Sequence, residues 1–345
     1  MKLNIFLSLS ILTTLVSCSG QNSSRTIDMP PSLTIGDTVN KLENNIMSIY
    51  QDTKNNYWFG SWEDGLYRYD GKTILHFTST SSLPDNRIED IKEDKSGNIY
   101  FNTSRGISKF DGYNFTTLTL VNSDNQWKLE PDDLWFKSAQ FKDEVFRYDG
   151  KFLYKLQLPK HPNYSNPYAV YCIYKDSKGN VWFGTNPLGV FRYNGKSIDW
   201  ISEEDVTELH DGPANGVRSI IEDKDEYFWF NSAYRYNIYG KSNKQKLKFY
   251  DREKNIGNLD GNPDSDFWEY LSIARDKNND LWIATYANGV WRYDGNKTSY
   301  YPVQDEGKDI TLFSIYKDKH DELWLGTHKN GVYKFNGSTF ERFKP

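Results

Sequence analysis

One short phrase returns seven times along the chain, and it limits the possible folds more than any other feature. Its clearest copy runs from Val170 to Thr185 and continues from Gly189 to Gly195. Every copy carries one anchoring aromatic residue, at Trp58, Tyr100, Trp135, Trp182, Trp229, Trp282 and Trp324. In six copies an Asp lies six residues earlier, at Asp52, Asp94, Asp176, Asp223, Asp276 and Asp318. Such a chain is expected to build its core by stacking one repeat unit on the next.

Each copy predicts a four-stranded antiparallel sheet. In the last copy, residues 312–317 and 323–327 have the β-branched and aromatic pattern of strands and are separated by a polar turn. Two more extended runs follow, at 331–335 and 339–343. Asn336-Gly337 between them indicates a hairpin, because a type I′ turn needs positive φ at both central residues. Asp-Gly or Asn-Gly closes six of the seven copies.

Seven such sheets predict an all-β fold, a seven-bladed β-propeller of four-stranded antiparallel blades. A lone sheet of this size cannot bury both faces, whereas seven can stack around an axis with the anchoring aromatics between them. The count favours seven blades over six or eight. The third copy (125–158) has lost the Asp and Gly of its first turn, and the fifth (217–253) lacks the Asp-Gly hairpin. Residues 33–45 resemble a surplus outer strand, which we expect to pair with the last blade and close the ring.

The amino terminus predicts export and a lipid anchor. Lys2 precedes an apolar run from Ile5 to Val16, which is too short to span a bilayer as a permanent helix. The following Leu15-Val-Ser-Cys18 resembles the lipobox of bacterial lipoproteins, which implies cleavage before Cys18 and lipidation of Cys18. The alternative is an ordinary signal peptide with a chance Cys. The predicted division is a signal peptide at 1–17, a lipidated Cys and flexible tether at 18–32, and the propeller at 33–345. Ser19 favours the outer membrane as the destination in the cell envelope.

Charge and cysteine content exclude several classes of function. The net charge is −5, and Lys and Arg are spread through every repeat, so no basic face for nucleic acid is visible. Besides Cys18 the chain has one thiol, Cys172, so no disulfide framework is expected. Cys172 lies where other copies carry Ser, which favours a buried structural thiol over a nucleophile.

The repeat resembles a known family. Asp-x-x-Gly-Asn-x-Trp-Phe-Gly-Thr followed by Gly-Val-Phe-Arg-Tyr-Asn-Gly is similar to the two-component regulator propeller repeat, and the connector 83–88 is similar to the linker before each repeat of that family. The resemblance covers roughly residues 40–345. Members commonly form the extracytoplasmic sensor of hybrid histidine kinases and are thought to sense glycan breakdown products. The resemblance therefore implies the propeller fold and a binding role outside the cytoplasm.

The order of the strands predicts where a binding site would lie. In an antiparallel blade, the loops between the second and third strands share one face with the connectors between blades. These loops vary from copy to copy, and variable loops on a rigid scaffold are where binding usually resides. Aromatic residues with Arg, Asn and His at a concave channel mouth suit a polar ligand such as a sugar. The predicted ligand-binding residues are Trp62, Arg105, Asn186, Tyr234, Tyr286 and His328. The alternative is that these are plain loop residues on a solvated rim.

No catalytic motif is present, so we predict neither catalytic residues nor a cofactor. The segment 258–266 alternates carboxylates and amides that could wrap Ca²⁺, but its spacing fits no standard calcium loop. The sequence favours a lipid-anchored, non-catalytic envelope protein that binds a polar small molecule, an oligosaccharide or a partner protein, and touches the membrane only through its lipid. Two alternatives stay open. One is an envelope lyase or hydrolase using His161, His210 or His328 on the same face. The other is a scaffold lipoprotein.

Overall fold

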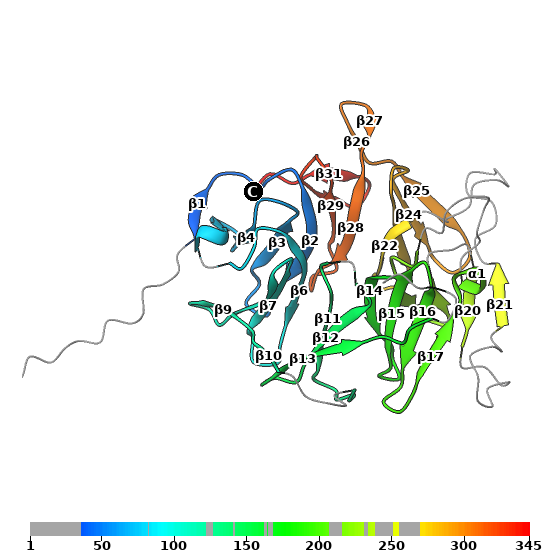
Figure 1. Cartoon of the computed structure of the whole chain (residues 1–345). Helices are drawn as coiled ribbons and strands as arrows, with labels where there is room; N and C mark the ends of the chain where they lie inside the picture. The colour runs from blue at the N-terminus through cyan, green and yellow to red at the C-terminus, as the bar shows by residue number, and fades with distance from the viewer. Residues whose placement is uncertain are drawn as a thin grey trace, which may run out of the picture. The chain divides into compact units, whose positions relative to one another are not determined.

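Seven small sheets form a ring, which confirms the predicted seven-bladed β-propeller (Figure 1). The computed structural model describes residues 36–81, 83–121, 127–140, 142–161, 164, 168–206, 216–230, 234–238, 251–254 and 270–345, within the compact unit Thr34–Pro345. The predicted signal peptide and the lipidation site at Cys18 lie outside the described residues. The blades are nearly all β. The helical elements among the described residues are η1 (Ser79–Ser81) and α1 (Glu203–Val206), and no described helix has the length and apolar character needed to cross a membrane.

The strands follow the repeat copy by copy. The first two blades consist of β2 (Ile46–Gln51), β3 (Tyr57–Ser61), β4 (Leu66–Tyr69) and β5 (Ile74–Phe77), and of β6 (Ile88–Glu93), β7 (Ile99–Thr103), β8 (Gly106–Phe110) and β9 (Phe115–Thr117). The third contains β10 (Leu120–Val121), β11 (Leu134–Lys137), β12 (Glu144–Tyr148) and β13 (Leu153–Gln157). The fourth contains β14 (Ala169–Lys175), β15 (Val181–Asn186), β16 (Gly189–Tyr193) and β17 (Ile198–Ile201).

The remaining three blades complete the ring. They are formed by β18 (Ile221–Glu222), β19 (Phe228–Trp229), β20 (Tyr234–Asn237) and β21 (Asp251–Lys254), by β22 (Tyr270–Arg275), β23 (Leu281–Thr285), β24 (Val290–Tyr293) and β25 (Thr298–Tyr301), and by β28 (Leu312–Lys317), β29 (Leu323–Thr327), β30 (Val332–Phe335) and β31 (Phe340–Arg342). A small hairpin, β26 (Gln304–Asp305) with β27 (Lys308–Asp309), projects between the last two blades at the top of Figure 1.

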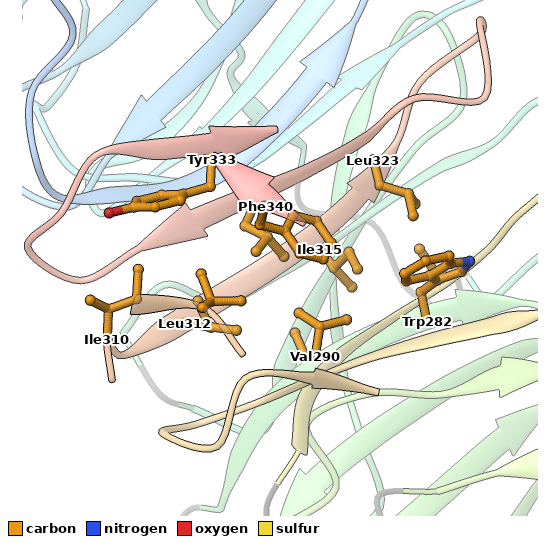
Figure 2. Packing of buried hydrophobic residues seen from close by; sticks show 12 residues of the cluster. Trp282, Val290, Ile310, Leu312, Ile315, Leu323, Tyr333 and Phe340 are labelled. Atoms are coloured by element: carbon orange, nitrogen blue, oxygen red, sulfur yellow. The ribbon is translucent and has the colours of Figure 1, made fainter. Parts of the chain in front are cut away.

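The anchoring aromatics pack between neighbouring blades, as expected. Trp182 is fully buried, and its ring centroid lies 4.8 Å from that of Phe228 and 5.5 Å from that of Phe230 in the next blade. Figure 2 shows the same arrangement between the sixth and seventh blades, where Trp282 packs in one apolar cluster with Leu323 and Phe340. Burial of large aromatic surface at each blade junction is therefore a main source of cohesion.

The recurring Asp organises the first turn and fixes the anchoring Trp. In the fourth copy, Asp176 Oδ1 accepts hydrogen bonds from the backbone N–H groups of Lys178 and Asn180, at 3.0 and 2.8 Å. Asp176 Oδ2 accepts the indole N–H of Trp182 at 2.8 Å. The same bond to the anchor recurs from Asp52, Asp94, Asp223, Asp276 and Asp318. One carboxylate thus satisfies both the turn and the polar atom of a buried aromatic residue.

The hairpin between the third and fourth strands of a blade differs from the expected two-residue type I′ turn. In the first blade Tyr69 pairs with Ile74, which leaves a four-residue loop, and within Asp70-Gly71 only Gly71 has positive φ. Asp70 Oδ1 accepts the N–H groups of Thr73 and Lys72, and these two bonds hold the pKa of Asp70 below its ordinary value. The side chain of Asp supplies the acceptor that a tighter backbone turn would otherwise provide.

The ring closes in a way that the sequence did not indicate. The surplus strand β1 (Asp37–Val39) pairs antiparallel with β5, so it extends the first blade instead of completing the last. Closure comes from contacts between the first and last blades. The ring of Tyr57 lies 4.8 Å from that of Trp324, and its hydroxyl donates to Asp318 at 2.6 Å. The first and last blades therefore exchange no strand, and side-chain contacts join them.

The third blade departs most from the repeat. Its innermost strand is β11, and β10 pairs parallel with the outer strand β13. Leu129 stands where the other copies have this Asp. Asp133 lies two residues before the anchor, as Asp280 does in the sixth copy, and forms a buried ion pair with Arg147 at 2.8 Å, as Asp280 pairs with Arg292. The inner antiparallel strand present in the other copies is thus absent from the described part of this blade.

Candidate functional site

The loops sort onto two faces, as the strand order predicted. Trp62 N donates to Asn45 O at 3.3 Å, and Gly331 N donates to the adjacent Asn44 O at 2.7 Å. The loop of Trp62 and the loop that contains His328 and Gly331 therefore meet the same connector and lie on one face. We call this the connector face. It comprises the loops between second and third strands and the connectors between blades.

The opposite face, which we call the turn face, carries a closed set of polar contacts between blades. Two examples are Ser177 Oγ to Glu222 Oε1 at 2.8 Å and Lys319 N to Gln51 Oε1 at 2.8 Å. The other junctions are joined by Thr53–Glu93, Lys95–Asp132, Lys175–Pro131, Arg275–Glu222 and Lys277–Asp321. These contacts link neighbouring blades at all seven junctions, so the turn face helps to hold the ring together.

The inner edges of the blades present a feature that the sequence reasoning missed. The first strands of five blades contain a β-bulge, at Met47, Glu89, Tyr171, Leu271 and Phe313. Arg218 occupies the matching sequence position in the fifth copy. First strands of neighbouring blades contact one another, so they lie nearest the axis. A bulge removes one residue from the ladder and re-aims its side chain, and bulges often accompany functional sites. We call these residues the bulge positions.

The fourth and fifth blades bring three polar groups together. The guanidinium Cζ of Arg218 lies 4.4 Å from the ring centroid of Tyr171, and the Tyr171 hydroxyl accepts a hydrogen bond from Asn186 Nδ2 at 3.2 Å. Arg218 is exposed. A Cβ on Gly216 would lie 2.5 Å from Asn186 Cβ, so only glycine allows this close approach. Asn186 was a predicted site residue, and its hydrogen-bond partner Tyr171 occupies a bulge position.

Trp62 is half-buried against a second set of charges. The guanidinium Cζ of Arg87 lies 3.4 Å from the centre of the Trp62 ring. Arg87 pairs with Glu89 at 2.5 Å, and Glu89 also pairs with Lys137 at 3.1 Å. The Glu89 side chain is only 3% exposed, so this carboxylate is held by two cations from different blades. One face of the Trp62 ring is covered by Arg87, and the side chain as a whole is half-buried.

The remaining predicted residues do not form one cluster. Tyr286 is 46% exposed, and its carbonyl accepts the N–H of Leu312 at 3.0 Å. His328 packs on Phe313 with ring centroids 5.1 Å apart. Tyr234 lies in β20, where its backbone pairs with Lys254. Arg105 pairs with Asp85 at 3.1 Å and lines a separate pocket. Trp62, Asn186 and His328 each contact a residue of a neighbouring connector or first strand.

The carboxyl group of Glu203, beside this site, has a raised pKa. Glu203 is 4% exposed, and burial raises its pKa to about 7, against the opposing effects of a hydrogen bond from Gly216 N at 2.7 Å and the nearby charge of Arg218. The folded protein therefore holds this proton to higher pH than an unfolded chain would. Glu203 changes charge near neutral pH next to the Tyr171–Arg218 pair.

The other candidate groups named from the sequence are Cys172, the His residues and the segment 258–266. Burial raises the pKa of the Cys172 thiol to about 12, and its Sγ lies 3.5 Å from Val217 O, so a nucleophilic thiolate is disfavoured. His161 packs on Trp200, while His210 and the segment 258–266 lie outside the described residues. Within the described ranges no group of three or more His, Cys, Asp and Glu side chains is placed to hold a metal ion.

Comparisons with known proteins agree with the fold and the repeat. The model of the two component regulator propeller family matches residues 40–63 and 164–186. A curated relative, histidine kinase P4 of Formosa agariphila, is 26% identical over 268 residues, which cover 70% of this chain and 19% of the relative. The chain thus spans about a fifth of that relative's length.

Solved structures share the same propeller architecture. One is the extracellular domain of a candidate one-component system of B. thetaiotaomicron, with a TM-score of 0.58, 19% identity, and coverage of 90% of this chain and 40% of that one. Another is virginiamycin B lyase of Staphylococcus aureus, with a TM-score of 0.60, 18% identity, and coverage of 86% and 97%. At these identities the likeness concerns the fold, which occurs both in the extracellular domain of a one-component system and in a lyase.

Proposed function

We propose that this chain, two segments of which match the two component regulator propeller model, is a sensor-like, non-catalytic module of the cell envelope that binds a glycan-derived ligand at its connector face. The observation that supports this best is the Tyr171–Arg218–Asn186 group at the inner edge of the blades. It presents an exposed cation, an aromatic ring and an amide side by side. Such a combination can stack on the apolar face of a sugar and hydrogen bond to its hydroxyl groups.

The proposal includes a lipid anchor at Cys18, which is motivated by the lipobox-like Leu15-Val-Ser-Cys18. A protein held only by its lipid keeps the propeller close to the membrane while residues 18–32 act as a tether. This arrangement suits a module that captures a ligand in the envelope, with the outer membrane as the proposed location. Partner proteins would reach the same connector face.

Trp62→Ala is expected to weaken glycan binding while leaving the melting temperature nearly unchanged, because the ring is only half-buried and aromatic rings stack on sugars. The measurement is a glycan array probed with the parent protein and with the variant, together with thermal melts of both. Tyr113→Ala is the matched control, since Tyr113 is 60% exposed and lies in the turn between β8 and β9, on the turn face.

We expect the control to bind like the parent. If the Trp62→Ala protein gives the same array signals as the parent, Trp62 is no part of the site. If Tyr113→Ala removes the signals instead, binding takes place at the turn face and the proposed face is wrong.

A second candidate function is an envelope enzyme that acts on a glycan at the same face. The observation that favours it is Glu203, whose pKa of about 7 suits proton transfer at neutral pH and which lies close to Arg218. Its burial argues for a role in holding the connector instead, through the bond from Gly216 N. Incubation of an array ligand with the protein, followed by mass spectrometry of the glycan, separates the two functions, since only an enzyme would yield cleaved product.

A further inference from the structure

A pocket of about 360 Å³ lies between the second and third blades, apart from the bulge positions. Its rim on the second blade is the loop from Thr103 to Gly106, and its wall on the third blade is formed by β12, β13 and the segment 138–140. The volume lies within the range of small-molecule sites, roughly 300–1,000 Å³. Of the predicted site residues, Arg105 lines this pocket, while Trp62, Asn186, Tyr286 and His328 do not.

The pocket forms where the third blade departs from the repeat. Leu120 of the parallel strand β10 and Leu153 of β13 both line it, so the irregular pairing of this blade shapes its wall. Asn102 Nδ2 donates to Lys137 O at 2.9 Å and ties the two blades together at this junction. The walls are thus parts of the ordered sheets, which favours a preformed site.

The charged lining is predominantly cationic. Three cations, Arg105, Lys142 and Lys155, face one carboxylate, Glu144. Glu144 accepts from Lys155 Nζ at 3.3 Å. Arg105 is held at its Nε by Asp85, which is not part of the lining, and its side chain stays 77% exposed. With Asp85 counted beside Arg105, three cations face two carboxylates, and this excess of positive charge favours a negatively charged group.

The rest of the lining is divided between polar and apolar groups. Ser104, Gln140 and Thr117 supply hydroxyl and amide groups, and Phe146 and Leu118 supply apolar surface. Hydroxyl and amide groups pair with ligand hydroxyls, and an aromatic or aliphatic wall packs on C–H groups. A bare inorganic anion would leave both parts of this lining unused.

We propose that this pocket is a second binding site, independent of the connector-face site at the bulge positions, and that it takes a hydroxylated carboxylate of monosaccharide size. Arg105 pairs with the carboxylate through its guanidinium, with Lys142 adding charge. The polar lining orients the hydroxyl groups, and Phe146 packs on the apolar face of the ligand. Arginine suits this role because its fork of N–H donors matches a carboxylate.

The test is calorimetric titration of the full chain with galacturonate and glucuronate, with glucose and inorganic phosphate as comparison ligands. We expect a sugar acid to bind more tightly than glucose and phosphate. Arg105→Ala should weaken this binding about tenfold, through loss of a charge-assisted hydrogen bond. Glu144→Gln should tighten it several-fold, because the change removes the negative charge of the lining and releases Lys155.

Two controls separate the pocket from general effects. Lys95→Ala removes a cation of equal exposure, 77%, that pairs with Asp132 on the turn face, and it should leave binding unchanged. Trp62→Ala should also leave it unchanged, so that failure of the connector-face proposal stays distinguishable from failure of this one. Equal binding of phosphate and sugar acids, absence of binding at millimolar sugar acid, or equal affinity of parent and Arg105→Ala would overturn the proposal.

Discussion

Trp182→Ala is expected to lower the free energy of unfolding by roughly 3–5 kcal/mol, as large-to-small changes of buried aromatics do. The side chain is fully buried between the fourth and fifth blades, and its indole N–H is bonded to Asp176 at 2.8 Å. The change would leave a cavity at a blade junction and deprive Asp176 of one donor. Urea denaturation followed by tryptophan fluorescence and circular dichroism measures the loss.

The control for this prediction lies on the same blade. Trp200 is 40% exposed on the outer strand, so Trp200→Ala should cost no more than about 1 kcal/mol. A Trp182→Ala protein as stable as the parent would count against the blade assignment. Equal destabilisation by both changes would show that position relative to the blade junction has no influence.

Cys18→Ser is expected to move the protein from the membrane fraction to the soluble envelope fraction. The proposed lipid on Cys18 is the only anchor that we infer, and a serine hydroxyl cannot carry the thioether-linked lipid. Fractionation of cells that express the parent and the variant, followed by immunoblotting, measures the distribution.

Cys172→Ser provides the matched control, because it removes the other thiol at a position where several copies of the repeat carry Ser. It should stay in the membrane fraction. A Cys18→Ser protein that still pellets with membranes and resists salt washing would mean that another anchor exists and that the lipobox interpretation is wrong or incomplete.

The fold was largely predictable because the repeat encodes its own local bonds. The Asp six residues before the anchor is the hydrogen-bond acceptor of the turn and of the Trp indole, as seen for Asp318 and Trp324. A fixed spacing of these two residues therefore marks each blade in the sequence. The third copy lacks this Asp at its usual place, and there the strand order also changes.

Two features required the structure. Pairing of β1 with β5 instead of the last blade depends on which edge is nearest in space, and no local pattern encodes that choice. The β-bulges were missed as well, although the spacing of apolar residues in the first strands indicates them. The buried residues Ile46 and Ile49 are three positions apart, as are Leu312 and Ile315, whereas a regular strand repeats every two residues.

The sequence indicated which loops carry the candidate site residues, but not which side chains contact them. Equivalent loop positions predicted a shared face for Trp62 and His328, and their loops contact the same connector, while their role in binding stays a prediction. The partners of these residues come from other segments, since Arg87 belongs to a connector and Phe313 to a first strand. Arg105 follows the second strand of its own blade as Trp62 does, yet it lines the pocket beside the irregular third blade. Packing between segments far apart in the sequence gives these two equivalent loops different surroundings.

The most direct test of the connector face as the binding face is hydrogen–deuterium exchange with and without the strongest glycan ligand of the array. We expect ligand-dependent protection of backbone amides in residues 44–47, 61–65, 168–171, 216–218 and 286–289. The turns at 53–56, 95–98, 177–180 and 319–322 should exchange equally in both states. Protection confined to those turns, with no change in the connector-face segments, would contradict the account.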